Sequence, residues 1–262
     1  MSDVVFLFPG QGSQYVGMGK SFFDERASVR QLFERASDIV KKDLARLCFE
    51  GPEATLIQTD NVQPAITLVS LACLQVLREE GVEPSAAAGH SLGEYAALCA
   101  AGVFSVDETM RLVDVRGRAM REAAERYPGG MIAVFGLGIE ALTAICKEVA
   151  SVGSVEVANH NSPLQVALTG EKAALTKAGE LAKAQGARLV VPLKVSGAWH
   201  SRFMADAKGP MQRALDACVP ARAKICCSRS ILSSKVCTSL RPFRPPRTAR
   251  HLPRATPAGT RG

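Results

Sequence analysis

A serine stands between two glycines at the spacing Gly-x-Ser-x-Gly, in the stretch "GHSLG" of residues 89–93. A serine hydroxyl attacks a carbonyl carbon well only when a nearby base takes its proton. Glycines on both sides permit the sharp turn that exposes such a serine at the end of a strand. The helix after the turn would direct the backbone N–H of Leu92 to where an oxyanion forms. The pattern predicts Ser91 as a nucleophile of acyl transfer or hydrolysis; a small residue in a tight turn is the alternative.

The base that this serine needs has four candidates, which are His90, His160, His200 and His251. His90 is adjacent to the serine, and neighbouring side chains at such a turn point apart. His251 lies in a terminal segment without hydrophobic periodicity, and His160 lies in a predicted small subdomain. His200, in "SGAWHS", follows Ser91 by 109 residues, in the chain order of α/β hydrolases. The sequence favours His200 as the base, and a loop histidine without a role is the alternative.

The segments around the serine alternate between strand and helix patterns. Val4–Phe8 is a short apolar run ended by Pro-Gly, which is typical of a buried strand. Residues 85–88 form a second short run directly before the Gly-x-Ser-x-Gly turn. Helices are predicted over 64–81, with a proline in the first turn, and after Ser105, whose capping-box partner would be Glu108. The serine therefore falls where a strand turns into a helix.

Residues 131–191 follow a different order of elements. Strands are predicted over 131–135, 155–158, 165–169 and 188–191, and helices over 140–149 and 172–185. This βαββαβ order is the ferredoxin-like pattern. We predict an α/β protein, in which a hydrolase-like large subdomain with a parallel sheet carries an inserted ferredoxin-like small subdomain. The predicted boundaries are 1–127 and 195–218 for the large subdomain and 128–194 for the small one.

Charge is unevenly spread along the 262 residues. Ten of the 32 Lys and Arg lie in residues 221–262, which hold no Asp or Glu, so the net charge of +7 comes from this segment and the first 220 residues carry −3. Residues 219–262 are rich in Pro and Arg and lack a hydrophobic period, which predicts a disordered tail. The tail also lacks the interleaved aromatic residues of a segment that binds nucleic acid. We therefore expect no nucleic-acid partner.

The eight cysteines indicate reduced thiols. None forms a Cys-x-x-Cys pair, and no Cys/His spacing matches a zinc site, so no metal is predicted. No run of eighteen apolar residues suggests a membrane span, and the N-terminus lacks the features of a signal peptide. We expect a cytoplasmic protein without a membrane partner.

Several sequence blocks in a fixed order resemble one family. The main blocks are "FLFPGQGSQYVGMG" (6–19), "DNVQPAI" (60–66), "GHSLGEYAAL" (89–98) and "SGAWHS" (196–201), with "VRGRAM" (115–120) and "VANHNSPLQVALTG" (157–170) in addition. Together they resemble the malonyl-CoA:acyl-carrier-protein transacylases and the acyltransferase domains of fatty-acid and polyketide synthases. The resemblance covers about residues 3–217, and it is far more specific than the serine motif alone.

The resemblance implies roles for individual residues. Ser91 would carry the acyl group, and His200 would act as its general base and acid. The backbone N–H groups of Gln11 and Leu92 would form the oxyanion hole. Arg116 would hold the free carboxylate of malonate by two parallel hydrogen bonds, which a lysine cannot reproduce.

Two further positions, Gln63 and Asn159, match the family's active site with less defined roles. Without the resemblance, Arg116 is better interpreted as a solvated charge on a helix. The weight of the substrate prediction therefore rests on the family blocks rather than on the arginine itself.

The implied reaction is ping-pong acyl transfer from malonyl-CoA to the phosphopantetheine thiol of an acyl carrier protein. Both partners supply their own sulfur, so the resemblance implies no metal and no redox cofactor, and it implies a monomer. Two alternatives stay open. One is a serine hydrolase on the same scaffold, and the other is a truncated, inactive chain.

The sequence departs from the family after residue 218. The family normally continues with a further strand, a glutamine whose backbone carbonyl orients the catalytic histidine, and a glycine-rich segment. None of these is recognisable in residues 219–262, whose Arg, Pro, Ser and Cys bias resembles translation in a wrong frame. We expect an aberrant end of the reading frame here, with loss of a core strand.

Overall fold

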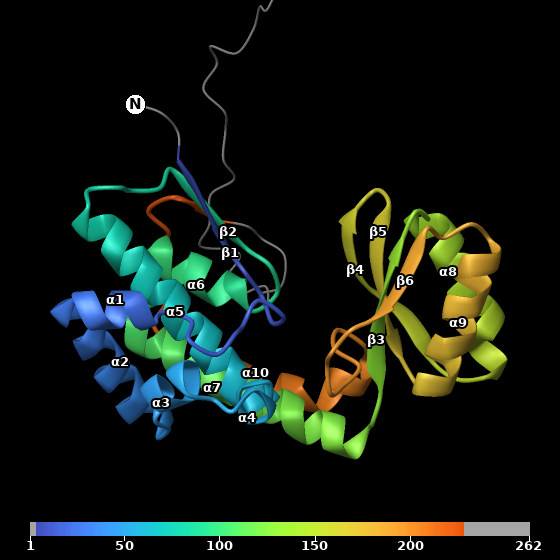
Figure 1. Cartoon of the computed structure of the whole chain (residues 1–262), viewed down its shortest axis with the longest axis horizontal. Helices are drawn as coiled ribbons and strands as arrows, with labels where there is room; N and C mark the ends of the chain where they lie inside the picture. The colour runs from blue at the N-terminus through green and yellow to red at the C-terminus, as the bar shows by residue number, and fades with distance from the viewer. Residues whose placement is uncertain (1–3, 228–262) are drawn as a thin grey trace, which may run out of the picture.

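Two short segments form neighbouring strands of a parallel sheet. The computed structural model describes residues 4–227. In it β1 (Val5–Phe8) pairs in parallel with β2 (Ala86–Gly89), and both lie where the sequence predicts a strand (Figure 1). The expectation that β1 is a buried strand is wrong, because only Phe6 and Phe8 face the core while Val5 and Leu7 are 54% and 77% exposed. The register sets Phe8 opposite Gly89, so both strands end at the same edge of the sheet. The glycine-rich loop after β1 and the Gly-x-Ser-x-Gly turn after β2 therefore meet there.

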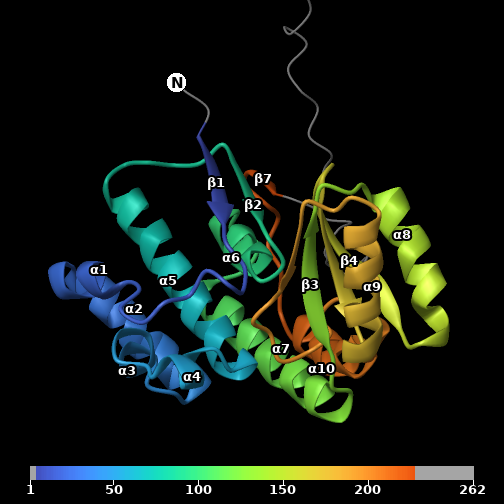
Figure 2. The same ribbon diagram turned by 45° about the vertical axis from the view of Figure 1, so that its right-hand side comes forward.

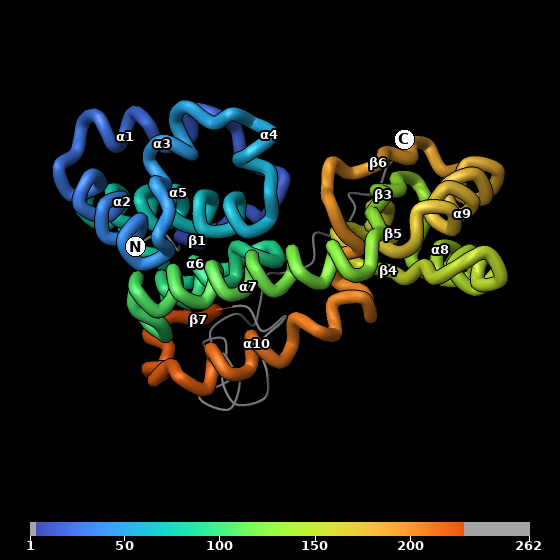
Figure 3. The backbone as a smooth tube through the Cα atoms, turned by 90° about the horizontal axis from the view of Figure 1, so that it is seen from below, coloured from blue at the N-terminus to red at the C-terminus, as the bar shows by residue number. Residues whose placement is uncertain are grey.

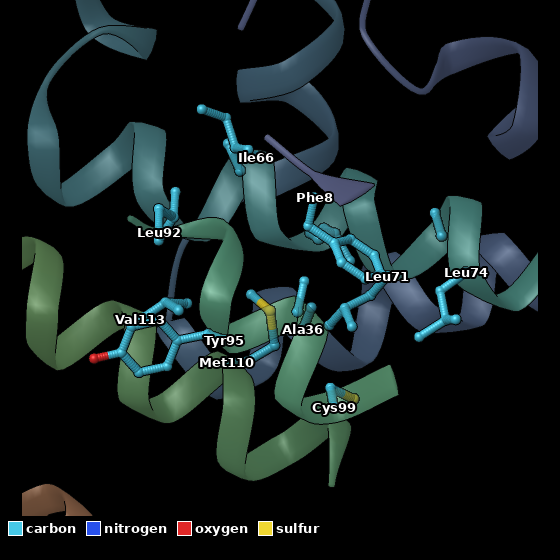
Figure 4. Close-up of a cluster of buried hydrophobic side chains, with 14 of the residues drawn as sticks. Phe8, Ala36, Ile66, Leu71, Leu74, Leu92, Tyr95, Cys99, Met110 and Val113 are labelled. Atoms are coloured by element: carbon cyan, nitrogen blue, oxygen red, sulfur yellow. The ribbon is translucent and has the colours of Figure 1, made fainter. Parts of the chain in front are cut away.

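Helices enclose this sheet and build the larger of the two bodies in Figure 1. They are α1 (Lys20–Glu25), α2 (Ala27–Val40), α3 (Leu44–Phe49), α4 (Glu53–Leu56), α5 (Thr59–Glu79), α6 (Gly93–Ala100) and α7 (Val106–Arg126). Side chains from β1, α5, α6 and α7 interdigitate in the core, among them Phe8, Leu71 and Met110 (Figure 4). This packing fixes α6 and α7 against the end of β2.

α7 begins where the capping signal predicts it. The Glu108 backbone N–H donates to Ser105 Oγ at 3.2 Å, and the Ser105 backbone N–H donates to the Glu108 carboxylate at 2.8 Å. The helix then runs from the first body to the second (Figure 3). Near its end Met120 and Ala124 pack in one apolar cluster with Met131 of the second sheet. α7 is thus the rigid connection between the two bodies.

α5 begins at Thr59, one turn before the predicted start at Pro64. Proline has no N–H, so the carbonyl of Asp60, four residues earlier, lacks its usual helical donor. The ammonium of Lys42, between α2 and α3, donates to that carbonyl at 2.8 Å instead. The predicted start was wrong because Lys42, from another part of the chain, satisfies the Asp60 carbonyl that Pro64 leaves without a donor.

The second sheet is antiparallel, with the order β4-β5-β3-β6. Its elements are β3 (Gly130–Phe135), α8 (Ile139–Glu148), the 3₁₀ turn η1 (Val149–Ser151), β4 (Val155–Ser162), β5 (Gln165–Gly170), α9 (Lys172–Ala184) and β6 (Leu189–Pro192). The two helices lie on one face of the sheet (Figure 2). The predicted βαββαβ order is confirmed.

After β6 the chain returns to the first sheet. It passes through the 3₁₀ turn η2 (Arg202–Met204) and then α10 (Ala205–Asp216), which packs along α7 (Figures 2 and 3). The last element of the described residues is β7 (Cys226–Cys227). β7 pairs in parallel with β2, which makes β2 the central strand.

The predicted tail therefore does not hold for residues 219–227. The backbone N–H groups of Ala221 and Lys224 donate to carbonyls after α6, at 2.9 Å each. Ala223, Ile225 and Cys227 alternate with exposed residues and pack against the first core. Backbone pairing needs no particular side chains, and this period of two was the signal that sequence reasoning missed. The rest of the predicted tail, 228–262, lies outside the described residues.

Within residues 4–227, no helix is both long and apolar enough to cross a membrane.

Candidate active site

Ser91 occupies a strained turn between β2 and α6. Its φ is 52°, in the left-handed region that few residues other than glycine adopt. A Cβ on Gly89 would lie 2.0 Å from the carbonyl carbon of Gly93, and a Cβ on Gly93 would lie 2.1 Å from the carbonyl oxygen of Phe8. Neither position can hold another residue without moving backbone. The two glycines of the motif are therefore required by the geometry that presents Ser91.

His200 reaches the serine from the loop after β6. The distance from its Nε2 to Ser91 Oγ is 2.9 Å, within reach for proton transfer. Its own φ is 61°, again in the left-handed region. The loop is held by Ser201, whose Oγ donates to the Ala198 carbonyl at 2.6 Å and accepts from the Phe203 backbone N–H at 3.2 Å. Sequence reasoning paired the two residues, and the structure brings them together.

The surroundings of His200 favour its neutral form. Burial is the largest cause that lowers the pKa of His200 to about 4, and the electrostatic influence of Arg116 and of the His90 ring acts in the same direction. A neutral imidazole can accept the serine proton at neutral pH. No group in the described part of the chain hydrogen-bonds to its Nδ1. The carbonyl that the family resemblance implies for this nitrogen is thus not among residues 4–227.

Arg116 lies on α7 with its guanidinium against the nucleophile. Its Nη2 donates to Ser91 Oγ at 3.1 Å, and its Nη1 donates to Gln63 Oε1 at 2.8 Å. Gln63 is fully buried on α5 and donates in turn to the sulfur of Met120 at 3.4 Å. The guanidinium carbon stands 5.8 Å from the centre of the Tyr95 ring. The solvated helix charge expected without the resemblance is excluded, because Arg116 is only 8% exposed.

This burial has an electrostatic cost. It lowers the pKa of Arg116, although Tyr95 and Glu94 on α6 act in the opposite direction. A buried charge is expensive unless it is paired or hydrogen-bonded, and charges kept at such cost are candidates for function. The described hydrogen-bond partners of Arg116 are the side chains of Ser91, Gln63 and Tyr95, none of which is a carboxylate. A carboxylate beside the serine would therefore be a stronger partner.

The two predicted oxyanion donors flank the same turn. A Cβ on Gly10 would lie 2.6 Å from the carbonyl oxygen of His90, so the loop after β1 packs directly on the turn with Gln11 next in the chain. Leu92 begins the approach to α6 and is buried. Neither the Gln11 nor the Leu92 backbone N–H donates to an acceptor within the described residues. Their role as oxyanion donors stays a prediction.

Asn159 is the predicted site residue on the second sheet. It lies on β4 opposite Ala167, and no hydrogen bond among the described residues joins it to Ser91, His200 or Arg116. Asn161, two residues on, approaches the turn instead, with its Oδ1 3.3 Å from Nε2 of His90. Sequence reasoning missed this contact, because the block "NHNSP" does not indicate which distant segment it approaches.

The described residues contain no cluster of three or more His, Cys, Asp or Glu side chains that could hold a metal ion. The prediction of no metal ligand and the predicted roles of the site residues stay predictions.

The comparisons with known proteins agree with this geometry. The family model for the acyl transferase domain matches residues 5–251, which extends past the end of the resemblance expected from sequence. The malonyl CoA-acyl carrier protein transacylase of Bacillus subtilis (strain 168) is 42% identical over 219 residues, which cover 83% of this chain and 69% of that protein. A second Bacillus subtilis protein of that name is 41% identical, and the aligned part is 82% of this chain but only 54% of its length. The aligned part of this chain thus spans 69% of the length of the first relative and 54% of the length of the second.

A solved structure shows the same fold. It is a malonyl-transacylase in complex with the acyl-carrier protein of a type II polyketide synthase, with a TM-score of 0.82 and 40% identity, covering 86% of this chain and 74% of that one. The parallel three-stranded sheet and the separate antiparallel four-stranded sheet agree with that fold. The chain belongs to the acyl transferase domain family.

Proposed function

We propose that this chain transfers a malonyl group from CoA to the phosphopantetheine thiol of an acyl carrier protein, through a malonyl ester of Ser91. The observation that carries the proposal is the double contact of Ser91 Oγ, which lies 2.9 Å from the His200 imidazole and 3.1 Å from the Arg116 guanidinium. A nucleophile, a base and a carboxylate-binding cation meet at one atom. The names of the relatives, malonyl CoA-acyl carrier protein transacylases, support the same substrate pair.

The first half of the reaction acylates the serine. His200 Nε2 accepts the proton of Ser91 Oγ while Oγ bonds to the thioester carbon of malonyl-CoA. The carbonyl oxygen becomes an oxyanion beside the backbone N–H groups of Gln11 and Leu92, which stabilise it. The carbon–sulfur bond then breaks, and His200 returns the proton to the departing sulfur of CoA.

The second half reverses these steps with a new thiol. His200 accepts the proton of the phosphopantetheine thiol, and the sulfur attacks the ester carbon of malonyl-Ser91. The ester bond breaks, and Ser91 Oγ recovers the proton from His200. Every bond and proton is accounted for by the serine, the imidazole and the two thiols. No residue is consumed, so the site turns over.

Arg116 supplies the choice of acyl group. A malonyl group carries a free carboxylate two carbons from the thioester carbon. The thioester carbon must reach Ser91 Oγ, and the Arg116 guanidinium is hydrogen-bonded to that same atom. A carboxylate there would form a charge-assisted pair in a buried setting, which an acetyl group cannot form. Gln63 holds the other side of the guanidinium and so fixes its plane.

The proposed division of the chain is a large subdomain of residues 1–127 and 195–227 and a small ferredoxin-like subdomain of residues 128–194. The end expected at residue 218 moves to 227, because β7 pairs with β2. The large subdomain holds Ser91, Arg116 and Gln63. His200 follows the second crossing between them. Ser91, Arg116, Gln63 and His200 would thus all belong to the large subdomain, and a cytoplasmic location is part of the proposal.

The test is the intact mass of the purified chain after mixing with malonyl-CoA, followed by peptide mapping. The expected result is one malonyl adduct on the peptide that contains Ser91, which disappears when a holo acyl carrier protein is added and appears on the carrier. Loss of the adduct to water, with free malonate released and no malonyl carrier formed, would show a hydrolase. No adduct on a folded chain would overturn transfer by this chain.

The low pKa of His200 predicts the pH dependence of the first half-reaction. A base with pKa about 4 stays neutral and active down to acidic pH and is lost only as pH falls through that value. Because kcat/KM reports the free enzyme, we expect it to stay nearly constant from about pH 8 to about pH 5.5. An ordinary histidine would halve it near about pH 6.5, and that midpoint, with circular dichroism showing an intact fold, would contradict the prediction.

A further inference from the structure

A charged network outside the reacting groups holds the first turn of α5. The Asp60 carboxylate is 14% exposed and binds two cations from different elements. Its Oδ1 accepts from Arg121 Nη1 of α7 at 2.9 Å, and its Oδ2 accepts from Lys42 Nζ at 2.9 Å. Burial alone would raise the pKa of Asp60, but these hydrogen bonds outweigh it and hold the pKa below its usual value. The carboxylate is therefore charged at neutral pH and ties three segments together.

Lys42 also repairs the backbone of this turn. Besides Oδ2, it donates to the Asp60 carbonyl at 2.8 Å, the carbonyl that Pro64 leaves without a helical donor, and to Asn61 Oδ1 at 2.7 Å. One ammonium thus satisfies three acceptors on the first turn of α5. Without such a donor, a turn before a proline would be free to shift.

The same turn is in backbone contact with α7 beside the arginine of the site. A Cβ on Gly117 would lie 2.9 Å from the carbonyl oxygen of Thr59 and 3.0 Å from the Cα of Asp60. Arg116 is the neighbour of this glycine, and Arg121 follows one turn later. The Asp60–Arg121 pair therefore joins the two helices beside a place where their backbones are in close contact.

Gln63 lies one turn after Asp60 on α5, and its Oε1 accepts from Arg116 Nη1 at 2.8 Å. A shift of the first turn of α5 relative to α7 would change this bond directly. Thr59 of the same turn also reaches the loop of the base, with its Oγ1 3.4 Å from Ser196 Oγ. The turn thus contacts both the guanidinium side and the imidazole side of the nucleophile.

We propose that Asp60 is a positioning residue for Arg116, because it clamps α5 to α7 through Arg121 and Lys42 and so fixes the Gln63 bond that orients the guanidinium. Selectivity for an acyl group with a free carboxylate then depends on a side chain that never touches the substrate. The inference rests on the proposed malonyl transfer. It extends that proposal to a residue and a network for which the sequence analysis expected no role.

The test compares two asparagine variants. Asp60→Asn keeps the shape of the side chain and removes the charge. Asp114→Asn is the matched control, because Asp114 lies on α7 near Arg116, is also 14% exposed, and pairs with Arg118 at 2.9 Å. The measurement is kcat/KM with malonyl-CoA and with acetyl-CoA. For Asp60→Asn we expect about a 10-fold loss with malonyl-CoA and less than about a 2-fold change with acetyl-CoA. Asp114→Asn should leave the ratio of the two unchanged.

A second variant separates positioning from simple destabilisation. Arg121→Gln removes the same clamp from the α7 side, at a residue that is 44% exposed. It should lower the malonyl to acetyl ratio like Asp60→Asn, and the double variant should lose little more than either alone, because both act through one interaction. Equal losses with both substrates would mean a structural role only and would overturn the inference.

The outcomes distinguish this inference from the proposed function. If the unchanged chain forms malonyl-Ser91 but Asp60→Asn keeps the full malonyl to acetyl ratio, the positioning role is refuted and the transfer stands. If the unchanged chain forms no adduct, the transfer fails, and the selectivity inference fails with it. A crystal structure of Asp60→Asn tests the positioning role without an activity measurement. We expect the Gln63–Arg116 hydrogen bond to be broken or moved in it, and an unaltered bond would refute the positioning role.

Discussion

Replacing Ser91 by alanine is expected to abolish malonyl transfer, with kcat lowered by at least about 10⁴-fold. Oγ is the atom on which both His200 and Arg116 converge, so its removal leaves the base and the cation without a nucleophile between them. Alanine keeps the Cβ at the strained φ of 52°, and the turn should therefore keep its shape. The measurement is intact mass after malonyl-CoA, with steady-state transfer to a holo acyl carrier protein.

The control for this variant is Ser85→Ala. Ser85 lies just before β2, is exposed, and donates its hydroxyl to the Val4 carbonyl at 3.0 Å, away from the proposed chemistry. This variant should keep full adduct formation. A malonyl adduct that persists on the Ser91→Ala chain, with a circular dichroism spectrum like that of the unchanged chain, would mean that another side chain is the nucleophile.

Local geometry explains what could be predicted from the sequence. The turn at Ser91 needs two glycines, because a Cβ at either position would overlap with backbone atoms. The sequence motif therefore indicates the turn directly. The capping box of Ser105 and Glu108 is likewise complete within four residues. The βαββαβ order follows from periodicity alone. In each case the determining contacts lie within one short segment.

Contacts between distant segments explain what could not be predicted. The start of α5 depends on Lys42, and the clamp on Asp60 joins α5 to Arg121 of α7; neither partner is visible in the local pattern. The approach of Asn161 to His90 crosses from the second sheet to the turn. β7 was missed because its two residues pair through backbone alone, and the alternation that precedes them spans only residues 223–227.

Arg116 lies between these cases. A charged residue on a helix indicates solvent exposure, and only the family resemblance assigned it to a substrate. The structure explains why a charge can be there, since α5 supplies Gln63 and α6 supplies the Tyr95 ring around the guanidinium. A buried guanidinium in such an environment can bind a carboxylate strongly. The effect of removing Arg116 on a substrate with a free carboxylate can therefore be predicted.

Arg116→Ala should therefore lower kcat/KM much more with malonyl-CoA than with acetyl-CoA. A buried, hydrogen-bonded charge pair that loses one partner typically costs 2–5 kcal/mol, so we expect kcat/KM with malonyl-CoA to fall by about 10²- to 10³-fold. With acetyl-CoA there is no carboxylate to bind, and kcat/KM should change by less than about 3-fold. The contact of Arg116 with Ser91 Oγ is also lost, but the His200 contact remains, so acylation itself should continue.

The matched control is Arg118→Ala, two residues along α7, where the guanidinium is 57% exposed and pairs with Asp114. This variant should leave kcat/KM unchanged with malonyl-CoA and with acetyl-CoA. Arg116→Lys completes the series, because it keeps the positive charge but loses the planar fork that can hold both Gln63 and a carboxylate. If charge alone selects malonyl groups, the lysine variant will resemble the unchanged chain; the geometry here expects it to resemble alanine more closely. Equal losses with malonyl-CoA and acetyl-CoA in Arg116→Ala would show that the arginine supports the nucleophile rather than the carboxylate.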